Sequence, residues 1–559
     1  MTSLVMHPGL VLIAGALLLL ALRGMARSTV SLGVPVLVLY LVWQVPDGVA
    51  WSVPFLDYQL TLIVGDRLSR LFATIFAMMA FGGALFALNQ KSPLELPAAL
   101  LYAGAAIGVT LAGDLITVFV FWELMAIGST LVIWSAGGSA YRASLRYLMI
   151  HLLGGVILMA GIAGHVAEFG TIEFTRMTLD SPAHWLILAG FLINAGAPPL
   201  SAWLPDAYPE ASWSGTVFLS AFTTKTAVYV LLRGFPGTEL LIYIGLFMVF
   251  YGIVYALLEN DMRRILAYSI VNQVGFMVTG IGIGTEMALN GTAAHAFTHI
   301  IYKALLLMSA GSVLFMVGKR KCTDLGGLFQ SMPVTAICGI VGALAISSFP
   351  LTSGFISKSM ISQSAADEHL FYVWLMLAAA SAGVFLHAGI KFPWFVFFQK
   401  DSGLRPPDPP RNMQWAMILF AALCIGLGVF PGPLYALLPY AVHYEPYTGA
   451  HVVTQLQLLL FSGLAFFVML NYLRRTLTLT LDVDWLYRVL FRGLARESVA
   501  GISRAGRDFE VAARKRMEQW GMGLLRQSSA MGAGSSWPTG RMALWAMVLL
   551  LGYLLLYYL

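Results

Sequence analysis

Apolar runs of about 20 residues recur along almost the whole chain, and they limit its fold more than any other feature. A helix of this length crosses the hydrocarbon core of a bilayer. Of the 559 residues, 59% are hydrophobic and only 11% are charged, whereas soluble domains carry roughly 25% charged residues. The sequence therefore predicts an all-α polytopic membrane protein.

We count about sixteen membrane spans, and the first, at about residues 9–23, is interpreted as a retained helix because no signal-peptide cleavage site follows it. Loops after odd-numbered spans are rich in Lys and Arg, for example Arg263-Arg264 and Lys319-Arg320-Lys321. Positive loops stay in the cytoplasm. Both termini are therefore expected on the non-cytoplasmic side.

Two spans are interrupted by proline. Pro198-Pro199 falls within the seventh span (184–204) and Pro350 within the twelfth (332–364). Proline removes a backbone donor and breaks a helix, and the freed carbonyls must be satisfied by protein or water. Because the breaks lie five spans apart, they predict two inverted five-helix repeats. Two unrelated proline kinks remain the alternative.

The expected organisation has five parts, ending in an amphipathic segment. From about Asp482 to Arg526, apolar residues such as Phe509 and Trp520 recur at helical intervals among many arginines. This pattern is typical of a helix that lies along a membrane surface or against other subunits. Gly501 and Gly506 are expected to divide that helix, and a Gly/Ser linker (528–536) leads to a final span. The parts are N-terminal spans (1–96), a first repeat (97–235), a second repeat (236–400), C-terminal spans (401–480), and the lateral helix with the last span (481–559).

Ionisable residues inside the spans are functional candidates, because a mid-membrane charge costs at least about 2.5–3.5 kcal/mol. Glu123 lies in the fifth span (115–135) and Lys225 in the eighth (212–233). Purely structural alternatives remain: a carboxylate bonded to a neighbouring helix, or a lysine whose amine reaches the interface.

In the eleventh span, His295, His299 and Lys303 have i, i+4, i+8 spacing and so share one helix face. Histidine titrates near neutral pH, which favours a proton relay over structural hydrogen bonding. Zinc is disfavoured because no third ligand is indicated. Lys358 follows the twelfth-span break, and His387 and Lys391 repeat the i, i+4 pattern in the thirteenth span.

The remaining composition indicates no other chemistry. The three cysteines are scattered, so no disulfide framework or metal site is indicated. The net charge of +6 is explained by cytoplasmic loops and requires no nucleic-acid partner. No redox-centre or nucleotide-binding motif is recognised. We therefore expect a transporter subunit without a cofactor, a metal or a catalytic centre of its own.

Several motifs in the same region resemble the proton-conducting membrane transporter family. That family includes the antiporter-like subunits of respiratory complex I, the large subunits of Mrp-type Na⁺/H⁺ antiporters and related hydrogenase subunits, and the detail is most similar to the D-type subunit of Mrp antiporters. The motifs lie within about residues 60–400 and together are highly specific. They are Gly65 to Ser69, Phe121 to Met125, Trp203 to Ala207, Thr224 to Tyr229, Asn260 to Ser269, His295 to Lys303, and Ser353 to Lys358.

The resemblance implies a role for each matching residue. Glu123 is similar to the glutamate that pairs with a lysine, and Lys225 to the connecting lysine. His295 and His299 match the relay histidines, and Lys358 matches the broken-helix lysine of the exit path. Asn194 stands where the family has its seventh-helix lysine. Asparagine cannot take up a proton near neutral pH, so Lys225 or Arg146 assumes that role, or water alone serves the first half.

The sequence thus predicts a proton-translocating subunit of an Mrp-like cation/proton antiporter in a prokaryotic plasma membrane. Its expected partners are lipid, protons and other integral membrane subunits, with Na⁺ left open. A pumping subunit of a redox complex is the first alternative. An inert scaffold, whose buried charges only fix helix packing, is the second.

Overall fold

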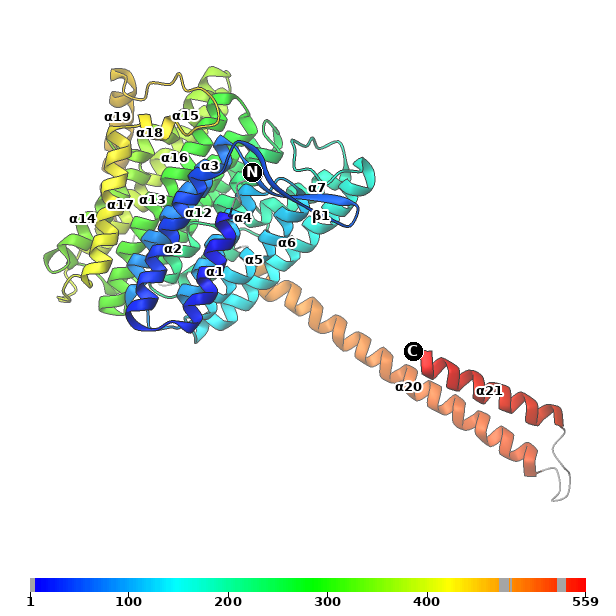
Figure 1. The fold of residues 1–559 in the computed structure, drawn as a ribbon. Helices are drawn as coiled ribbons and strands as arrows, with labels where there is room; N and C mark the ends of the chain where they lie inside the picture. The colour runs from blue at the N-terminus through cyan, green and yellow to red at the C-terminus, as the bar shows by residue number, and fades with distance from the viewer. Residues whose placement is uncertain (1–5, 472–481, 483–484, 530–538, 559) are drawn as a thin grey trace. The chain divides into compact units, whose positions relative to one another are not determined.

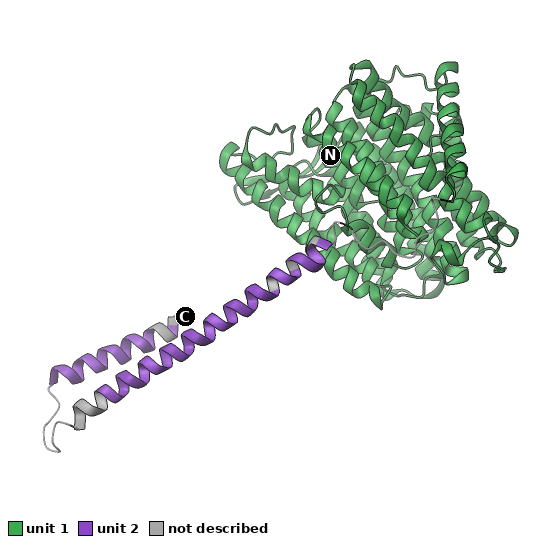
Figure 2. Ribbon diagram, turned by 180° about the vertical axis from the view of Figure 1, so that it is seen from behind, with its two compact units in different colours: residues 1–484 green, residues 485–559 purple. Residues whose placement is uncertain are grey.

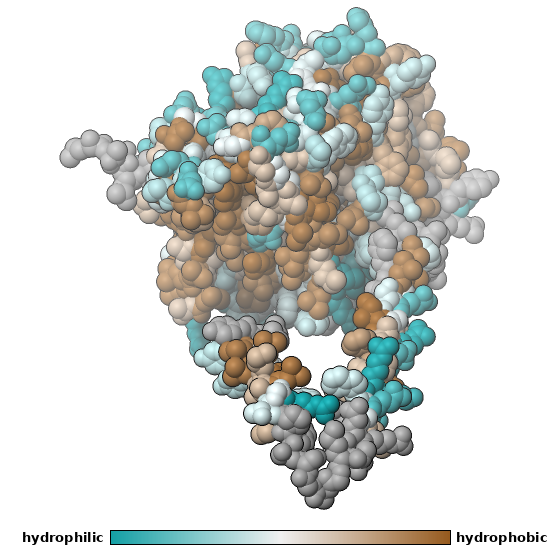
Figure 3. All heavy atoms as spheres, turned by 90° about the vertical axis from the view of Figure 1, so that its right-hand side faces the viewer, coloured by the Kyte–Doolittle hydropathy of each residue, from teal (hydrophilic) through white to brown (hydrophobic). Residues whose placement is uncertain are grey.

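The computed structural model describes residues 6–471, 482, 485–529 and 539–558, and it divides into two compact units (Figure 2). Unit 1 (Met1–Asp484) is a bundle of packed helices, and unit 2 (Trp485–Leu559) contains two helices. On the face of the bundle in Figure 3, hydrophobic side chains cover the middle and hydrophilic ones gather toward the upper end. The predicted polytopic membrane fold is confirmed.

Within the described residues, eleven helical segments are long and apolar enough to cross a membrane. Two of them, Gly215–Gly234 and Phe371–Phe398, combine shorter elements. The other nine are α2 (Gly24–Gln44), α3 (Arg67–Phe86, extended by a short turn to Asn89), α5 (Leu115–Trp134), α6 (Ser139–Phe169), α11 (Leu240–Leu258), α12 (Met262–Ile283), α13 (Glu286–Val317), α17 (Arg411–Val429) and α19 (Gly449–Val468) (Figure 1).

Shorter helices complete unit 1, and side-chain caps determine where several helices begin. Asp66 caps α3 in a reciprocal pair with Ser69, Asp114 caps α5, and Asp261 caps α12, each by accepting from the first free N–H groups. The shorter helices are α1 (Pro8–Ala21), α4 (Glu95–Leu111), α7 (Pro182–Ala195), α8 (Trp203–Ala207), α9 (Gly215–Leu219), α10 (Thr223–Gly234), α14 (Pro333–Ile346), α15 (Ser353–Asp367), α16 (Phe371–Val384) and α18 (Gly432–Tyr435).

Both predicted proline breaks are confirmed. α7 ends at Ala195 with Gly196 in the left-handed region (φ 78°), and helix resumes only at α8. α14 ends at Ile346, and α15 begins at Ser353 after two residues with positive φ, Ser348 and Leu351. These irregular segments leave backbone carbonyls available inside the bundle.

Two further irregularities were not predicted. The eighth span is not continuous, because residues 220–222 interrupt it between α9 and α10. In the thirteenth span, α16 is followed by π-helical turns over Phe385–Lys391 and Trp394–Phe398. A π-helical turn shifts the backbone pairing and frequently occurs at a functional site.

The all-α prediction is wrong in one detail, since β1 (Gly48–Phe55) and β2 (Tyr58–Gly65) form an antiparallel hairpin. Leu56 and Asp57 connect the strands. The backbone N–H of Thr61 donates to Asp114, at 2.7 Å, which joins β2 to the start of α5. One carboxylate thus caps a helix and anchors the hairpin.

Unit 2 consists of α20 (Phe491–Ser529), preceded by a π-helical turn at Leu486–Leu490, and α21 (Thr539–Tyr558). The predicted division at Gly501 and Gly506 is wrong, because α20 runs unbroken through both glycines. An isolated glycine costs a helix only about 1 kcal/mol. Most of the predicted Gly/Ser linker, and the proposed boundary at residue 481, lie outside the described residues.

Candidate functional site

The side chain of Lys225 is fully buried at the start of α10. Its Nζ donates to the carbonyl of Ser220, at 2.7 Å, and to Oγ1 of Thr224, at 3.0 Å. Ser220 lies in the interruption between α9 and α10, so the break supplies an acceptor that a continuous helix would have used itself. The structure therefore stabilises an ammonium group deep in the bundle.

The polar stripe of α13, formed by the three residues predicted to share one helix face, lies entirely in the core. His295, His299 and Lys303 are each fully buried. Nε2 of His295 lies 3.0 Å from Oε1 of Gln273, on α12, and Nδ1 lies 3.3 Å from Oγ of Ser357, on α15. Polar groups of two neighbouring helices thus converge on one imidazole.

The other two stripe residues have contrasting surroundings. Nζ of Lys303 donates to Oγ of Ser269, at 2.8 Å. Both ring nitrogens of His299 are buried without a hydrogen-bond partner among the described residues. Burying an unsatisfied polar group costs about 1–3 kcal/mol. Selection for helix packing alone does not explain a histidine at this position.

Beyond α13, the amines of Lys391 and Lys358 also differ in whether they have hydrogen-bond partners. Nζ of Lys391 donates to the carbonyls of Ala256, Leu257 and Glu259, at 3.1, 2.5 and 2.6 Å, where α11 ends. Nζ of Lys358 has no hydrogen-bond partner among the described residues and lies 4.4 Å from the ring centroid of Phe276. A desolvated cation at this distance is attracted by the ring.

Electrostatic interactions join the buried lysines and histidines of both predicted repeats into one row. Burial keeps such charges from being screened by salt, so a change of protonation at one position acts on the next. Nδ1 of His387 also lies 2.9 Å from the carbonyl of Gly383, which fixes its ring. The interacting pairs are Lys225 with Lys303, His299 with Lys225 and Lys303, His295 with Lys225 and Lys358, and His387 with Lys303, Lys358 and Lys391.

Three candidate residues lie apart from this row. Glu123 is half-buried, its Oε1 has no hydrogen-bond partner, and within the described residues it forms no ion pair. Arg146 makes a two-pronged ion pair with Asp206, at 2.8 and 2.9 Å. The lysine pairing that the resemblance implies for Glu123 is therefore not seen.

Asn194, the third, forms a pair that the sequence analysis missed. Its Oδ1 lies 2.7 Å from Nδ1 of His151, on α6, and both side chains are buried. His151 stands alone in a long apolar run, and that isolation was the available signal. Gln273 was overlooked because it is uncharged, although an amide buried among apolar residues also requires partners.

Comparison with known proteins finds a family match within the bundle. Residues 112–385 match the transmembrane family described as NADH:quinone oxidoreductase/Mrp antiporter. The matched stretch is just under half of the chain. The resemblance found from the motifs is confirmed, and the NADH:quinone oxidoreductase/Mrp match contains every residue of the row except Lys391 and His387, which follow directly after it.

Curated relatives of this family have several functions. The A/B subunit of a probable K⁺/H⁺ antiporter of Rhizobium meliloti is 30% identical over 68% of this chain. The D-type subunit of the Na⁺/H⁺ antiporter of Alkalihalophilus pseudofirmus is 29% identical over 59% of the chain, and the match covers 71% of that protein. The chain spans only 41% of the Rhizobium protein. The subunit type is thus not distinguished by these relatives.

Solved structures share the fold. The Mrp complex of Dietzia sp. DQ12-45-1b contains a chain that superposes with a TM-score of 0.76 over 88% of this chain and 59% of its own length, at 23% identity. The membrane-bound sulfane sulfur reductase, an archaeal respiratory complex, contains one with a TM-score of 0.73 over 98% of this chain and 99% of its own, also at 23% identity. At such identity the likeness establishes the fold alone.

Proposed function

We propose that this chain is the proton-translocating subunit of a multisubunit cation/proton antiporter of the Mrp type, in a prokaryotic plasma membrane. Protons pass along Lys225, His299, His295, Lys303 and Lys358, and His387 and Lys391 extend the row. The observation that carries the proposal is the complete burial of Lys225, His295, His299 and Lys303 in one helix bundle, with carbonyl, amide and hydroxyl groups bonded to three of them.

The row has the properties that proton transfer requires. Each ammonium except that of Lys358 is bound by carbonyl or hydroxyl oxygens that persist when the proton leaves. A proton arriving at one lysine repels the next, so charges advance by steps. We infer that the energy comes from a cation gradient through partner membrane subunits, since two relatives are named as subunits of a Na⁺/H⁺ antiporter.

Two finer features of the fold belong to this proposal. The described residues contain five shorter apolar helices besides the eleven long ones. If these five also cross the membrane, the chain has about sixteen spans. The breaks at residues 196–202 and 347–352 then occupy equivalent positions in two inverted five-helix repeats. The proposal includes both termini outside the cytoplasm, because the positive loops favour that orientation.

The test is proton uptake by the purified complex in liposomes. Lys225→Ala is expected to lower the initial rate at least tenfold, because the row loses its link between the repeats. Lys319→Ala, which removes an exposed lysine, is the matched control. If Lys225→Ala leaves the rate unchanged in an intact complex, the chain is a scaffold with respect to proton movement.

A proton-pumping subunit of a redox complex is the second candidate. Relatives named as the N subunit of an NADH-quinone oxidoreductase and the L subunit of an F420H2 dehydrogenase favour it. Mass spectrometry of the co-purified proteins separates the two. Small antiporter subunits support the first candidate, and iron–sulfur or nickel–iron subunits support the second.

A further inference from the structure

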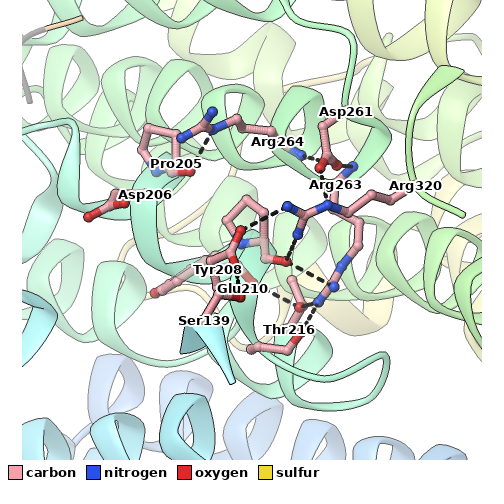
Figure 4. A network of polar contacts seen from close by, with 12 residues as sticks. Ser139, Pro205, Asp206, Tyr208, Glu210, Thr216, Asp261, Arg263, Arg264 and Arg320 are labelled. Atoms are coloured by element: carbon pink, nitrogen blue, oxygen red, sulfur yellow. Dashed lines mark hydrogen bonds and ion pairs between the residues drawn. The ribbon is translucent and has the colours of Figure 1, made fainter. Parts of the chain in front are cut away.

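A polar cavity of about 560 Å³ opens among loops at one end of the bundle. Its wall includes Gln90 and Ser135, from the loops on either side of α4 and α5, and Ser212, from the segment before α9. Arg263 and Arg320 complete one side of the wall and extend toward residues 208–216 (Figure 4). The cavity is open to solvent and can hold several water molecules.

The arginines give this cavity a rigid rim. Arg263, buried at the start of α12, donates to the carbonyls of Pro209, Ala211 and Ser212, at 3.0, 2.8 and 2.7 Å. Arg320 donates to Glu210, at 2.9 Å. Because both arginines are hydrogen-bonded to the segment before α9, they hold this side of the cavity in place.

A fully buried carboxylate lies directly behind the wall. Glu95, the first residue of α4, is 0% exposed. Its Oε2 accepts from Nε2 of Gln90, at 3.0 Å, and from Oγ of Ser135, at 3.2 Å, while Oε1 accepts from Oγ of Ser214. Glu95 forms no ion pair within the described part of the chain. Gln90 and Ser135 line the cavity, so the carboxyl group is one side chain away from water.

Hydroxyl groups lead from α4 toward Lys225. Tyr102 lies on the same helix as Glu95, about 10 Å further in at 1.5 Å per residue. Its hydroxyl lies 2.5 Å from Oγ1 of Thr223, and Thr223 immediately precedes Thr224, whose hydroxyl accepts from Nζ of Lys225. The hydroxyl of Tyr147 also lies 3.3 Å from Oγ1 of Thr223. Each of these groups can both accept and donate a proton.

We propose that Glu95 is the residue at which protons enter the pathway. A hydronium ion in the cavity gives its proton to the Glu95 carboxylate and remains as water. The protonated carboxyl group then gives up its proton on the inner side, toward the Tyr102 and Thr223 hydroxyls, and neutral Lys225, which is bonded to Thr224, takes up the proton. This inference rests on the proposed function and adds its point of entry.

The experiment compares Glu95→Gln with Glu95→Asp in the intact complex in liposomes. Gln keeps the length of the side chain and an acceptor oxygen but cannot titrate, whereas Asp titrates but is shorter. If Glu95 carries protons, Glu95→Asp is expected within about threefold of the native rate and Glu95→Gln at least tenfold below it. A purely structural carboxylate gives the reverse order, because Gln preserves the contacts better.

Asp114→Asn is the matched control. Asp114 is 1% exposed and accepts hydrogen bonds as the α5 cap, and asparagine caps helices equally well, so the native rate is expected. Lys225→Ala is measured in parallel. If Glu95→Gln has the native rate while Lys225→Ala is inactive, protons do not enter at Glu95, but the proposed function stands. If Lys225→Ala is active, the proposed function itself is wrong.

A second measurement applies even if the Glu95 variants fail to assemble. Ala136 is exposed on the cavity wall, and the three native cysteines are buried. A bulky disulfide-forming reagent on Ala136→Cys is expected to slow proton uptake at least fivefold, with recovery after reduction. Full labelling without slowing overturns the inference, because protons would then enter elsewhere.

Discussion

Phe276 offers the sharpest quantitative test of the proton row. Its buried ring on α12 lies 4.4 Å from Nζ of Lys358, measured to the ring centroid, and that amine has no hydrogen-bond partner among the described residues. The ring of His295 also lies near Phe276, with ring centroids 6.4 Å apart. Phe276→Leu removes the aromatic face and keeps an apolar side chain.

The size of the effect follows from the interaction that is lost. A desolvated cation on an aromatic face gains about 1–2 kcal/mol. One pH unit corresponds to 1.36 kcal/mol, so the ratio of protonated to neutral Lys358 at a fixed pH falls by roughly 5- to 30-fold. Because only the charged form loses stabilisation, a lower pH is needed to restore it. The pH profile of proton uptake should therefore move to lower pH by roughly 0.7–1.5 units.

The assay is the initial rate of proton uptake by complex-containing liposomes between pH 6 and 9. Phe276→Tyr retains the ring and should keep the native profile. Phe76→Leu, a fully buried phenylalanine on α3 that packs on other aromatic rings, controls for the loss of packing. If the Phe276→Leu profile coincides with the native one while Lys358→Ala is inactive, the ring does not hold the charged amine as argued.

Two predictions concern the rim of the cavity. Arg263→Met leaves three carbonyls of the 209–216 segment without their donors, and each costs about 1–3 kcal/mol where it is buried, so the complex should unfold at a lower temperature in detergent than with Arg263→Lys. Burial alone would raise the pKa of Glu210, but the hydrogen bond from Ser139 and the charge of Arg320 outweigh it and hold that pKa below its ordinary value. This ion pair therefore stabilises the fold above the ordinary carboxyl range and ceases to do so as pH falls through the lowered pKa; thermal unfolding across acidic pH should show a steeper loss for the native protein than for Glu210→Gln.

The buried charges could be found from sequence because they are rare. A lysine such as Lys225 or Lys358 within an apolar run is conspicuous, and the cost of its burial argues for function. Proline was equally informative, since Pro198-Pro199 and Pro350 each mark a real break. These signals are local, so one sequence suffices to read them.

Other features depend on tertiary contacts. Residues 220–222 contain neither glycine nor proline, so nothing in the sequence indicates that α9 stops and α10 restarts there. The hairpin is short, and its attachment to Asp114 crosses more than 50 residues of sequence. Glu95 was not singled out because it stands at a helix start, where a carboxylate is ordinary; its complete burial behind the cavity is visible only in three dimensions.

The irregular backbone segments supply hydrogen-bond acceptors for buried lysines. Lys225 binds a carbonyl released by the break between α9 and α10, and Lys391, itself in a π-helical turn, binds three carbonyls at the end of α11. A regular helix would have consumed those acceptors, so these two ammonium groups each depend on an irregularity close to them. Lys358 lacks such an acceptor and rests against a ring. Its ammonium is therefore the least firmly held of the row, and we propose Lys358 as the point at which a proton leaves.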